Sequence, residues 1–438
     1  MASSRGGEFL NRTTQETRQE KRREKGLLVG AGLDDYGESG NVPALDELAE
    51  LAATAGVTVI GRFWQRRAKP DSALYVGKGK VEEIASAARE DGADVVLFDN
   101  ELSPRQVRNL EKEIGCKVID RSEIILDIFA THAQTLAARL QVELAQLRYT
   151  LPRLKRMWTH LDRVTGQGGV GSRGPGEKQI ETDRRLIDRR LQQLEREIEE
   201  IKQRRERQVK TRDEELTVAL VGYTNAGKST LMNRLTGAGV LQADMLFATL
   251  DTKTSDFELP NGKRVLLSDT VGFIDKLPHH LVASFHATLE EVRQARLLLH
   301  VVDASHPAAE RQIETVDRVL RDELEVGEAE EVIVLNKIDL AAEPAALALL
   351  RERHPESIPV SAVTGEGMDA LIARIQQFDE RSRETLTLLL DAADGKTLAE
   401  LARLGDVLET HYEGEKVRVA VNLPKEVTPH FRRFALTS

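Results

Sequence analysis

One glycine-rich stretch of the chain holds residue types that could bind a nucleotide phosphate, in the spacing G-x-x-x-x-G-K-[ST]. The apolar, β-branched run at residues 216–221 predicts a buried strand before it, and Leu231 and Leu235 predict a helix that opens at Lys228. A loop between a strand and a helix points backbone N–H groups and the positive end of the helix dipole at a phosphate. We expect Lys228 to reach the β- and γ-phosphates and the Ser229 hydroxyl to bind Mg²⁺. The predicted phosphate-binding residues are Gly222, Tyr223, Thr224, Asn225, Ala226, Gly227, Lys228, Ser229 and Thr230.

Four further motifs follow this loop in the order that a small GTPase requires, which leaves little room for an ATPase. Thr249 lies in a predicted loop and could bind Mg²⁺ and sense the γ-phosphate, while Asp269 ends a predicted strand and would bind Mg²⁺ through water. The N–H of Gly272 would contact the γ-phosphate. The carboxylate of Asp339 can accept two hydrogen bonds that guanine offers and adenine does not, and the N–H of Ala362 would meet guanine O6. The predicted nucleotide-binding residues after the first loop are Phe247, Ala248, Thr249, Leu250, Asp269, Thr270, Val271, Gly272, Asn336, Lys337, Asp339, Ser361 and Ala362.

Phe273 stands directly after Gly272, where many GTPases place the glutamine that orients the attacking water. A phenylalanine can neither accept nor donate that proton, so the predicted catalytic set is Lys228, Thr249 and Gly272, without a catalytic glutamine. We therefore predict slow intrinsic hydrolysis that needs a partner to place the water or to supply a group. The amide oxygen of Asn225 could also help to hold K⁺ at the transition state, although it could instead hydrogen-bond within its own loop.

The elements that must position these residues alternate between strands and helices along most of the chain. Between residues 44 and 120, helices of about ten residues separate short apolar runs, which predicts a parallel sheet covered by helices. Here we interpret Ser103 and Pro104 as the start of a helix rather than as part of a ligand-binding loop. We predict an α/β protein with a flexible arm at residues 1–40, an N-terminal parallel-sheet α/β domain at 41–130, a basic antiparallel helical hairpin at 131–212, a Ras-like P-loop GTPase domain at 213–380 and a small C-terminal α/β domain at 381–438.

The predicted hairpin rests on two heptad seams, one that starts at Leu140 and one that starts at Ile187. A single seam of this length is not stable without a partner, so we expect the two to pack against each other. Pro152 should end or kink the first helix. The glycine-rich loop at residues 165–177 would form the tip, where the backbone can approach a ligand closely.

The hairpin is also where the basic charge of the chain is concentrated. Residues 131–212 carry 19 basic and 11 acidic side chains, whereas the rest of the chain has a net charge of −18. This asymmetry suggests a local contact with the phosphate backbone of a nucleic acid, with a solvated pair of helices as the alternative. The predicted RNA-binding residues are Arg163, Gly168, Gly169, Gly171, Arg173, Gly174, Gly176, Lys178, Arg184 and Arg185.

The overall composition, with 40% apolar and 31% charged residues, is that of a soluble globular chain. No apolar stretch approaches the roughly 20 residues that a membrane span needs, and the polar first 25 residues lack the apolar core of a secretory signal. The single cysteine, Cys116, rules out an intramolecular disulfide and fits a reducing cytoplasm. We expect a cytoplasmic monomer that binds GTP, GDP and Mg²⁺.

The hairpin and the GTPase motifs together resemble the HflX family of translational GTPases, from about residue 42 to the end of the GTPase domain. The most specific element is the run Gly-Gly-Val-Gly-Ser-Arg-Gly-Pro-Gly-Glu-Lys-Gln-Ile-Glu-Thr-Asp-Arg-Arg-Leu-Ile at residues 168–187. Leu-Gln-Val-Glu-Leu-Ala-Gln-Leu at 140–147 and Tyr-Val-Gly-Lys-Gly-Lys at 75–80 support it. The chain departs from the family pattern at Lys178, where threonine is usual, and at Thr-His-Ala-Gln (131–134), where a more basic stretch is common.

The resemblance implies that the N-terminal region binds the large ribosomal subunit and that the glycine-rich loop reaches towards the peptidyl-transferase centre. It further implies that the protein splits stalled or idle ribosomes, notably under stress. A hydrophobic residue at the position of Phe273, and stimulation of the GTPase by the ribosome, are also family features. GTP would hold the loops around Thr249 and Asp269 in place, and hydrolysis would release them.

Three other functions remain open from the sequence. A GTPase that acts in large-subunit assembly, or on another structured RNA, would share the chemistry and the hairpin, and would prefer precursors to mature subunits. An ATP-driven RNA remodeller with residues 77–80 as its phosphate loop is less favoured, because the motif is short and no suitable acidic residue stands nearby. A coiled-coil adaptor that binds GTP only structurally would show no partner-stimulated turnover.

Overall fold

The computed structural model describes residues 23–33, 43–156, 175–209, 216–237, 246–247, 249–275, 291–324, 329–341, 344–425 and 427–436. The predicted flexible arm is wrong for residues 24–32, which form a strand of the first sheet. Most of the rest of that arm lies outside these ranges, as do Ala248 and six of the predicted RNA-binding residues: Arg163, Gly168, Gly169, Gly171, Arg173 and Gly174. The chain forms two compact units, residues 1–131 with 149–184 and residues 132–148 with 185–438. Within the described ranges, every helix is too short or too polar to span a bilayer.

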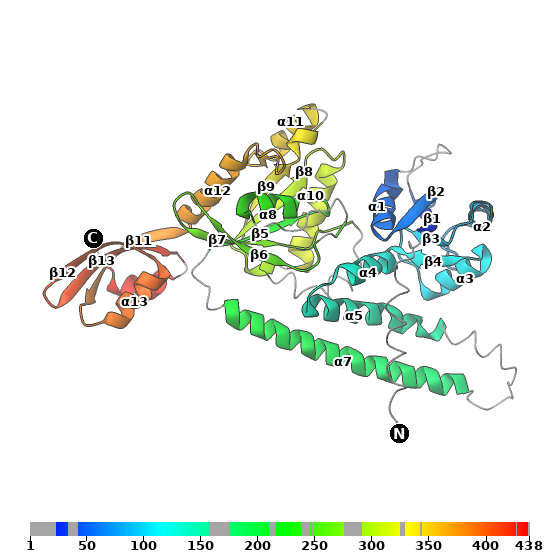
Figure 1. Cartoon of the computed structure of the whole chain (residues 1–438), viewed down its shortest axis with the longest axis horizontal. Helices are drawn as coiled ribbons and strands as arrows, with labels where there is room; N and C mark the ends of the chain where they lie inside the picture. Colours follow the sequence, from blue (N-terminus) through cyan, green and yellow to red (C-terminus); the bar gives the residue numbers. More distant parts are fainter. Residues whose placement is uncertain are drawn as a thin grey trace, which may run out of the picture. The chain divides into compact units, whose positions relative to one another are not determined.

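The first unit is built on a four-stranded parallel sheet in the order β2-β1-β3-β4 (Figure 1). This confirms the predicted parallel α/β fold of the N-terminal region. Its strands are β1 (Glu24–Gly32), β2 (Val57–Arg66), β3 (Val95–Phe98) and β4 (Lys117–Asp120). Its helices are α1 (Asp46–Thr54), α2 (Lys78–Asp91), α3 (Pro104–Ile114) and α4 (Arg121–His132).

Helix α4 was not predicted from the sequence, and its burial explains why. Its apolar residues cover most of its circumference, and Ile124, Ile125, Leu126, Ile128 and Phe129 are all buried, while Arg121 and Ser122 are polar and buried too. A helix with so broad a buried face, part of it polar, shows only a weak amphipathic period, which is the signal on which helix prediction depends. The start of α3, in contrast, is as interpreted from the sequence.

Ser103 begins α3 with a capping box, which confirms that this segment is a helix start. The backbone N–H of Gln106 donates to Ser103 Oγ at 3.3 Å, and the backbone N–H of Ser103 donates to Gln106 Oε1 at 2.9 Å. Pro104 occupies the first helical position, where its missing N–H costs nothing.

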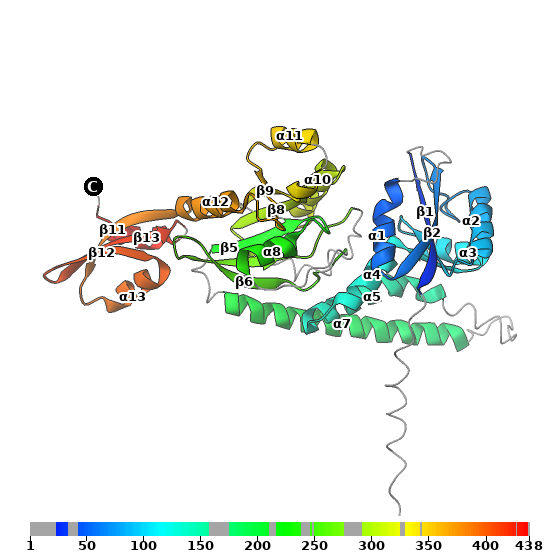
Figure 2. The ribbon, with the colours of Figure 1, turned by 45° about the horizontal axis from the view of Figure 1, so that its top comes forward.

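Helices α5 (Leu136–Thr150) and α7 (Pro175–Val209) run side by side in opposite directions (Figures 1 and 2), as the seams predict. Leu140, Leu144 and Leu194 are buried between them, with Leu191 and Ile198 packed alongside. Helix α5 ends at Thr150 and a 3₁₀ helix (Leu151–Arg156) follows, which agrees with the expected effect of the proline in that segment.

The predicted tip loop is shorter than expected, because α7 already begins at Pro175. Gly176 and Lys178 therefore lie in the first turns of a helix. A proline suits the first helical position because that N–H has no partner within the helix. Gly174 and Gly176 on either side of Pro175 are typical of a loop, which is why the sequence predicts a later helix start than the structure has.

The GTPase domain in the second unit contains a six-stranded sheet in the order β10-β9-β8-β5-β7-β6 (Figure 2). All neighbouring strands are parallel except β6, which pairs antiparallel with β7. The strands are β5 (Leu216–Gly222), β6 (Lys253–Glu258), β7 (Arg264–Asp269), β8 (Leu297–Asp303), β9 (Glu330–Asn336) and β10 (Ile358–Pro359). The helices are α8 (Lys228–Thr236), α10 (Ala309–Arg318), α11 (Pro344–Arg353) and α12 (Met368–Arg381), with a π-helical turn at Val319–Glu323 and a 3₁₀ helix at Ile338–Leu340.

The C-terminal region folds as a three-stranded antiparallel sheet in the order β11-β13-β12, with α13 against it. Strand β12 was missed from the sequence, because all eight of its residues are exposed and show no alternation. The expected closing helix is only four residues long and continues as a 3₁₀ helix. The elements are β11 (Arg383–Asp391), α13 (Gly395–Leu404), β12 (Asp406–Glu413), β13 (Lys416–Pro424), α14 (Thr428–Phe431) and a 3₁₀ helix at Arg432–Phe434.

Candidate nucleotide-binding site

The predicted nucleotide-binding residues gather where the parallel strands of the GTPase sheet end. Gly222 ends β5, Asp269 ends β7, Asp303 ends β8 and Asn336 ends β9. The carboxyl ends of parallel strands share one edge of the sheet, and open α/β sheets bind their ligands at that edge. Local motifs that lie more than 100 residues apart in sequence, such as Gly222 and Asn336, therefore meet in one place.

The phosphate-binding loop depends on two glycines with left-handed backbones. Gly222 has φ +147° and Gly227 has φ +93°, conformations that L side chains rarely adopt. A Cβ at Gly222 would also lie 2.2 Å from the Val301 carbonyl oxygen, and one at Gly227 would lie 2.3 Å from Asn336 Nδ2. Neither position can carry a side chain without moving backbone or the buried asparagine.

Lys228 lies buried under this loop at the first position of α8. Its ammonium donates to the carbonyl oxygens of Gly222 at 3.1 Å and Tyr223 at 2.8 Å. Burial lowers the pKa of Lys228 to about 8, and the charge of Asp269 opposes that shift. The lysine is thus held beneath the loop, next to where a phosphate would bind.

Three oxygen-bearing side chains meet beside the loop. Ser229 Oγ donates to Asp269 Oδ2 at 2.6 Å, Thr249 Oγ1 donates to the same oxygen at 3.1 Å, and the two hydroxyls are 2.8 Å apart. Asp269 is fully buried, and its second carboxylate oxygen, Oδ1, has no hydrogen-bond partner among the residues that the structure describes. Burial raises the pKa of Asp269, against the opposing effect of the Lys228 charge. A buried carboxylate with a spare oxygen and two hydroxyls is a donor set that fits Mg²⁺.

Asn336 joins the base-recognition motifs to the phosphate-binding loop. Its Nδ2 donates to the Ala226 carbonyl at 2.9 Å, and its Oδ1 accepts from the N–H of Ala362 at 3.1 Å. Lys337 has φ +63°, and its ammonium lies 2.7 Å from Asp303 Oδ2. Asp303 was missed from the sequence, although its position at the end of β8 was a usable signal.

The other two predicted base contacts differ in burial. Ser361 is fully buried, and its Oγ accepts from the N–H of Thr364 at 3.0 Å. Asp339 is exposed, in the 3₁₀ helix that follows Lys337. An exposed carboxylate at this edge is accessible to a guanine base.

Phe273 is fixed to the phosphate-binding loop through its backbone. Its N–H donates to the Gly222 carbonyl at 3.1 Å, and its carbonyl accepts from the N–H of Thr224 at 2.7 Å. The Phe273 side chain is buried, with 3% of its surface exposed. Gly272 is held close to the same loop, because an added Cβ would lie 2.7 Å from Thr224 Cα. Asn225 is exposed and has φ +60°.

The hairpin residues predicted to contact RNA are only partly described. Arg184 and Arg185 lie exposed on α7, and only the backbone is described for Gly176 and Lys178. Some of the basic charge is neutralised within the hairpin, since Arg190 forms a two-pronged pair with Glu143 at 2.7 and 2.8 Å. The exposed basic surface is therefore smaller than the sequence count implies.

The short glycine-lysine stretch of the N-terminal domain lacks the features of a phosphate loop. The N–H of Gly77 already donates to Gln65 Oε1 at 2.7 Å, and the Lys80 ammonium lies 2.6 Å from Glu83. The Gly77 N–H and the Lys80 ammonium therefore already have partners within the N-terminal domain. This geometry argues against the ATP-driven alternative at residues 77–80.

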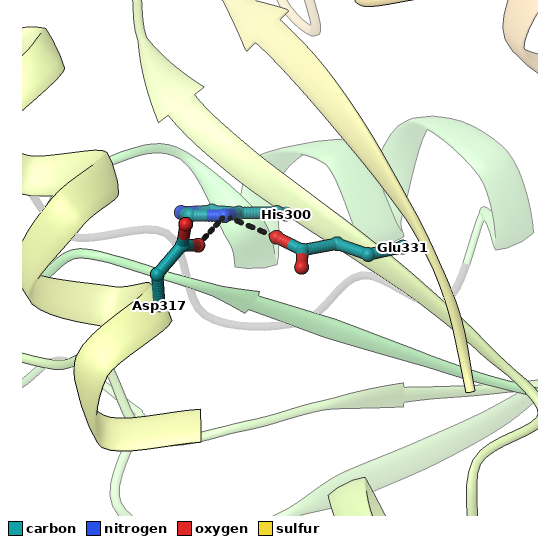
Figure 3. Close-up of side chains that lie close together, drawn as sticks. All are labelled: His300, Asp317 and Glu331. Carbon is teal, nitrogen blue, oxygen red and sulfur yellow. Dashed lines mark hydrogen bonds and ion pairs between the residues drawn. The ribbon is translucent and has the colours of Figure 1, made fainter. Parts of the chain in front are cut away.

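A second polar cluster lies within the GTPase domain and joins β8, β9 and α10 (Figure 3). Nδ1 of the buried His300 lies 2.8 Å from Glu331 Oε1 and 3.6 Å from Asp317 Oδ1. Although these three side chains are close enough to share a metal ion, Arg321 already pairs with Asp317 at 3.2 Å. Burial and the Glu331 charge raise the pKa of Asp317. Burial acts to raise the pKa of Glu331 too, but the hydrogen bond and charge of His300 outweigh it and lower the value. We interpret the cluster as a structural ion-pair network.

Three family profiles match successive parts of the chain. Residues 43–130 match the GTP-binding GTPase N-terminal family, and residues 132–212 match the GTP-binding GTPase middle region. Residues 217–337, which hold most of the site described above, match the family described as 50S ribosome-binding GTPase.

Individual proteins named GTPase HflX match this chain along most of their length. GTPase HflX of Magnetococcus marinus is 48% identical over 374 residues, which cover 85% of each chain. GTPase HflX of Escherichia coli is 44% identical over 384 residues, covering 87% of this chain and 89% of that protein. Among solved structures, a GTP-binding protein from Sulfolobus solfataricus in complex with GDP is 25% identical and covers 81% of this chain and 98% of its own, with a TM-score of 0.44.

Proposed function

Because this chain belongs to the HflX family of GTPases, and is thus a GTP hydrolase with a 50S ribosome-binding GTPase domain, we propose that it splits stalled or idle ribosomes. In this proposal it binds the large ribosomal subunit, and the ribosome stimulates its hydrolysis of GTP to GDP. The observation that best supports ribosome-dependent hydrolysis is Phe273, a buried phenylalanine fixed to the phosphate-binding loop at the position expected to orient the attacking water.

Each proposed role follows from the position of a side chain in the site. Lys228 would donate to the phosphates in place of the loop carbonyls that it now contacts. Ser229, Thr249 and Asp269 would hold Mg²⁺, which when bound neutralises charge on the β- and γ-phosphates. The N–H of Gly272 would contact the γ-phosphate. In this arrangement the residues of this chain position the phosphates, and the partner would position the attacking water.

The basic hairpin is the proposed contact with ribosomal RNA. The exposed Arg184 and Arg185 on α7 provide positive charge next to the glycine-rich segment, and such a surface binds phosphate backbones in a salt-dependent manner. A GTPase that acts in large-subunit assembly would use the same surface, so the two functions differ in the particle that they prefer.

The proposal is tested by GTP turnover with and without purified large subunits, in K⁺ buffer. We expect a rise of about tenfold or more, since a partner that completes a GTPase site accelerates hydrolysis strongly. The Lys228→Ala variant should show neither intrinsic nor stimulated turnover. Equal turnover with and without subunits would contradict ribosome stimulation and would direct the search for an activator elsewhere.

Splitting itself is measured by the fall in light scattering when the protein and GTP are added to vacant 70S ribosomes. A double variant, Arg184→Glu with Arg185→Glu, should lose subunit binding and splitting while keeping its intrinsic turnover. Tighter binding to large-subunit precursors than to mature subunits, without loss of scattering, would favour the assembly function instead.

A further inference from the structure

The loop that carries Thr249 is bonded through Asp251 to the segment where the helical hairpin begins. Asp251 Oδ2 accepts from the N–H of Gln134 at 3.0 Å and from that of Thr135 at 3.1 Å. The other carboxylate oxygen of Asp251 accepts from the Thr135 hydroxyl. All of these residues belong to the second compact unit.

Asp251 thereby anchors the start of a helix that lies 116 residues away in sequence. Helix α5 is 15 residues long and begins at Leu136, so Asp251 binds the two N–H groups directly before its first turn, and its negative charge lies near the positive end of the helix dipole. Thr135 adds its own cap, since its hydroxyl accepts from the N–H of Ala138 at 3.1 Å. Hydrogen bonds from N–H groups to an ionised carboxylate are among the stronger ones in proteins.

Thr249 lies two residues before Asp251. Its hydroxyl reaches the Ser229 and Asp269 oxygens, as a Mg²⁺ and γ-phosphate sensor must. A loop anchored two residues after Thr249 has fewer arrangements open to it, so the Asp251 attachment restricts where the Thr249 hydroxyl can lie.

We propose that Asp251 is a positioning residue for GTP hydrolysis, which holds Thr249 at the metal-binding oxygens by anchoring its loop to the start of α5. The proposal rests on the role assigned above to Thr249 in binding Mg²⁺ and the γ-phosphate. It adds a direct mechanical link between the nucleotide and the hairpin. The coupling is reciprocal: a nucleotide that fixes Thr249 also fixes the first turn of α5, and a partner that moves the hairpin releases Thr249.

The first test is nucleotide binding by the full chain without ribosomes. Asp251→Ala should weaken binding of a non-hydrolysable GTP analogue about tenfold or more and should lower intrinsic turnover. Its affinity for GDP should stay within about twofold of the wild type, since GDP lacks the γ-phosphate that Thr249 senses. The exposed Asp256 of β6, changed to alanine, removes the same charge nearby and should change neither affinity.

The second test follows hydrogen exchange at the start of α5. In the wild type, the N–H groups of Gln134 and Thr135 should exchange more slowly with the GTP analogue than with GDP, and Asp251→Ala should remove that difference. Asp251→Asn, which keeps an acceptor oxygen, should restore part of both effects.

Equal losses of GTP-analogue and GDP affinity in Asp251→Ala would show a merely structural role and would overturn the proposal. Wild-type binding and exchange in that variant would overturn it too. Neither readout uses a ribosome, so an absence of ribosome stimulation would leave this test intact.

Discussion

Gly272→Ala is the substitution for which the structure predicts the sharpest separation between binding and hydrolysis. The added Cβ would lie 2.7 Å from Thr224 Cα and 2.9 Å from Lys228 Nζ. The Lys228 side chain is flexible and can move away. The Thr224 contact is with a backbone atom, Cα, and the N–H of Thr224 is already bonded to the Phe273 carbonyl. Since carbon atoms approach no closer than about 3.4 Å in ordinary contact, the two loops must separate by about 0.7 Å.

That displacement sets the expected magnitude. Forcing an extra methyl group into a packed site costs about 1–3 kcal/mol, which corresponds to roughly a 5- to 150-fold change in an equilibrium constant. A reacting group displaced by about 1 Å can lose about 100-fold in rate. We therefore expect kcat with large subunits to fall about 100-fold in Gly272→Ala, with GDP affinity changed less than about tenfold, because GDP needs the phosphate-binding loop but not the Gly272 N–H.

The assay compares single-turnover hydrolysis of GTP with the displacement of a fluorescent GDP analogue. Gly395→Ala is the matched control, since a Cβ at that position, the first residue of α13, would meet nothing within 4 Å. Turnover by Gly272→Ala within about threefold of the wild type would refute the reasoning. Either Gly272 would then lie away from the γ-phosphate, or the loops would separate without cost.

Two further predictions concern ions and pH. If Asn225 helps to hold K⁺, replacing K⁺ with Na⁺ should slow hydrolysis about tenfold or more, and Asn225→Ala should be slow in both salts; unchanged turnover in Na⁺ would exclude the hypothesis. His300→Leu leaves the half-buried Asp317 and the exposed Glu331 without their shared imidazole, so it should lower the free energy of unfolding by about 1 kcal/mol at pH 8. The sign of the pH dependence differs between the two proteins. In the wild type the pKa of Glu331 lies below its ordinary value of 4.5, so its contribution to stability is present above that value and is lost as pH falls through the lowered one. In the variant both carboxyl pKa values should rise, and such groups gain stability as pH falls through them. Thermal unfolding should therefore show a smaller deficit at pH 5 than at pH 8, and an equal deficit at both would contradict the ion-pair interpretation.

The nucleotide motifs could be predicted from the sequence because each is a local unit of strand, loop and helix. Gly222, Gly227, Lys228 and Ser229 lie within one such unit. Because most of the later motifs also follow predicted strands, they meet at the same edge of the sheet. Helix α4 and strand β12 could not be predicted, because α4 is buried over most of its circumference and β12 is exposed on both faces. Neither shows the period on which such prediction depends.

Contacts between polar residues far apart in the chain could not be predicted from the sequence, for a different reason. Asp251, Asp303 and Asn336 each bond to a segment far along the chain, and no local pattern distinguishes such residues from exposed ones. For Asp303 and Asn336, the position at the end of a strand was the only usable signal. Asp251 had no such signal, because it follows a loop and anchors the start of a helix in another part of the chain.

The two loops proposed to sense the γ-phosphate are bonded to different parts of the molecule, which bears on how a ribosome would act on the site in the proposed function. The Gly272 loop is bonded through Phe273 to the phosphate-binding loop of its own domain. The Thr249 loop is bonded through Asp251 to the start of the hairpin. A partner that pulls on the hairpin can therefore move Thr249 while Gly272 stays in place. If the ribosome stimulates this chain as proposed, the stimulating group or water would have to be placed by the partner, because Phe273 is fixed and buried. Release of the hairpin after hydrolysis could come from this chain alone.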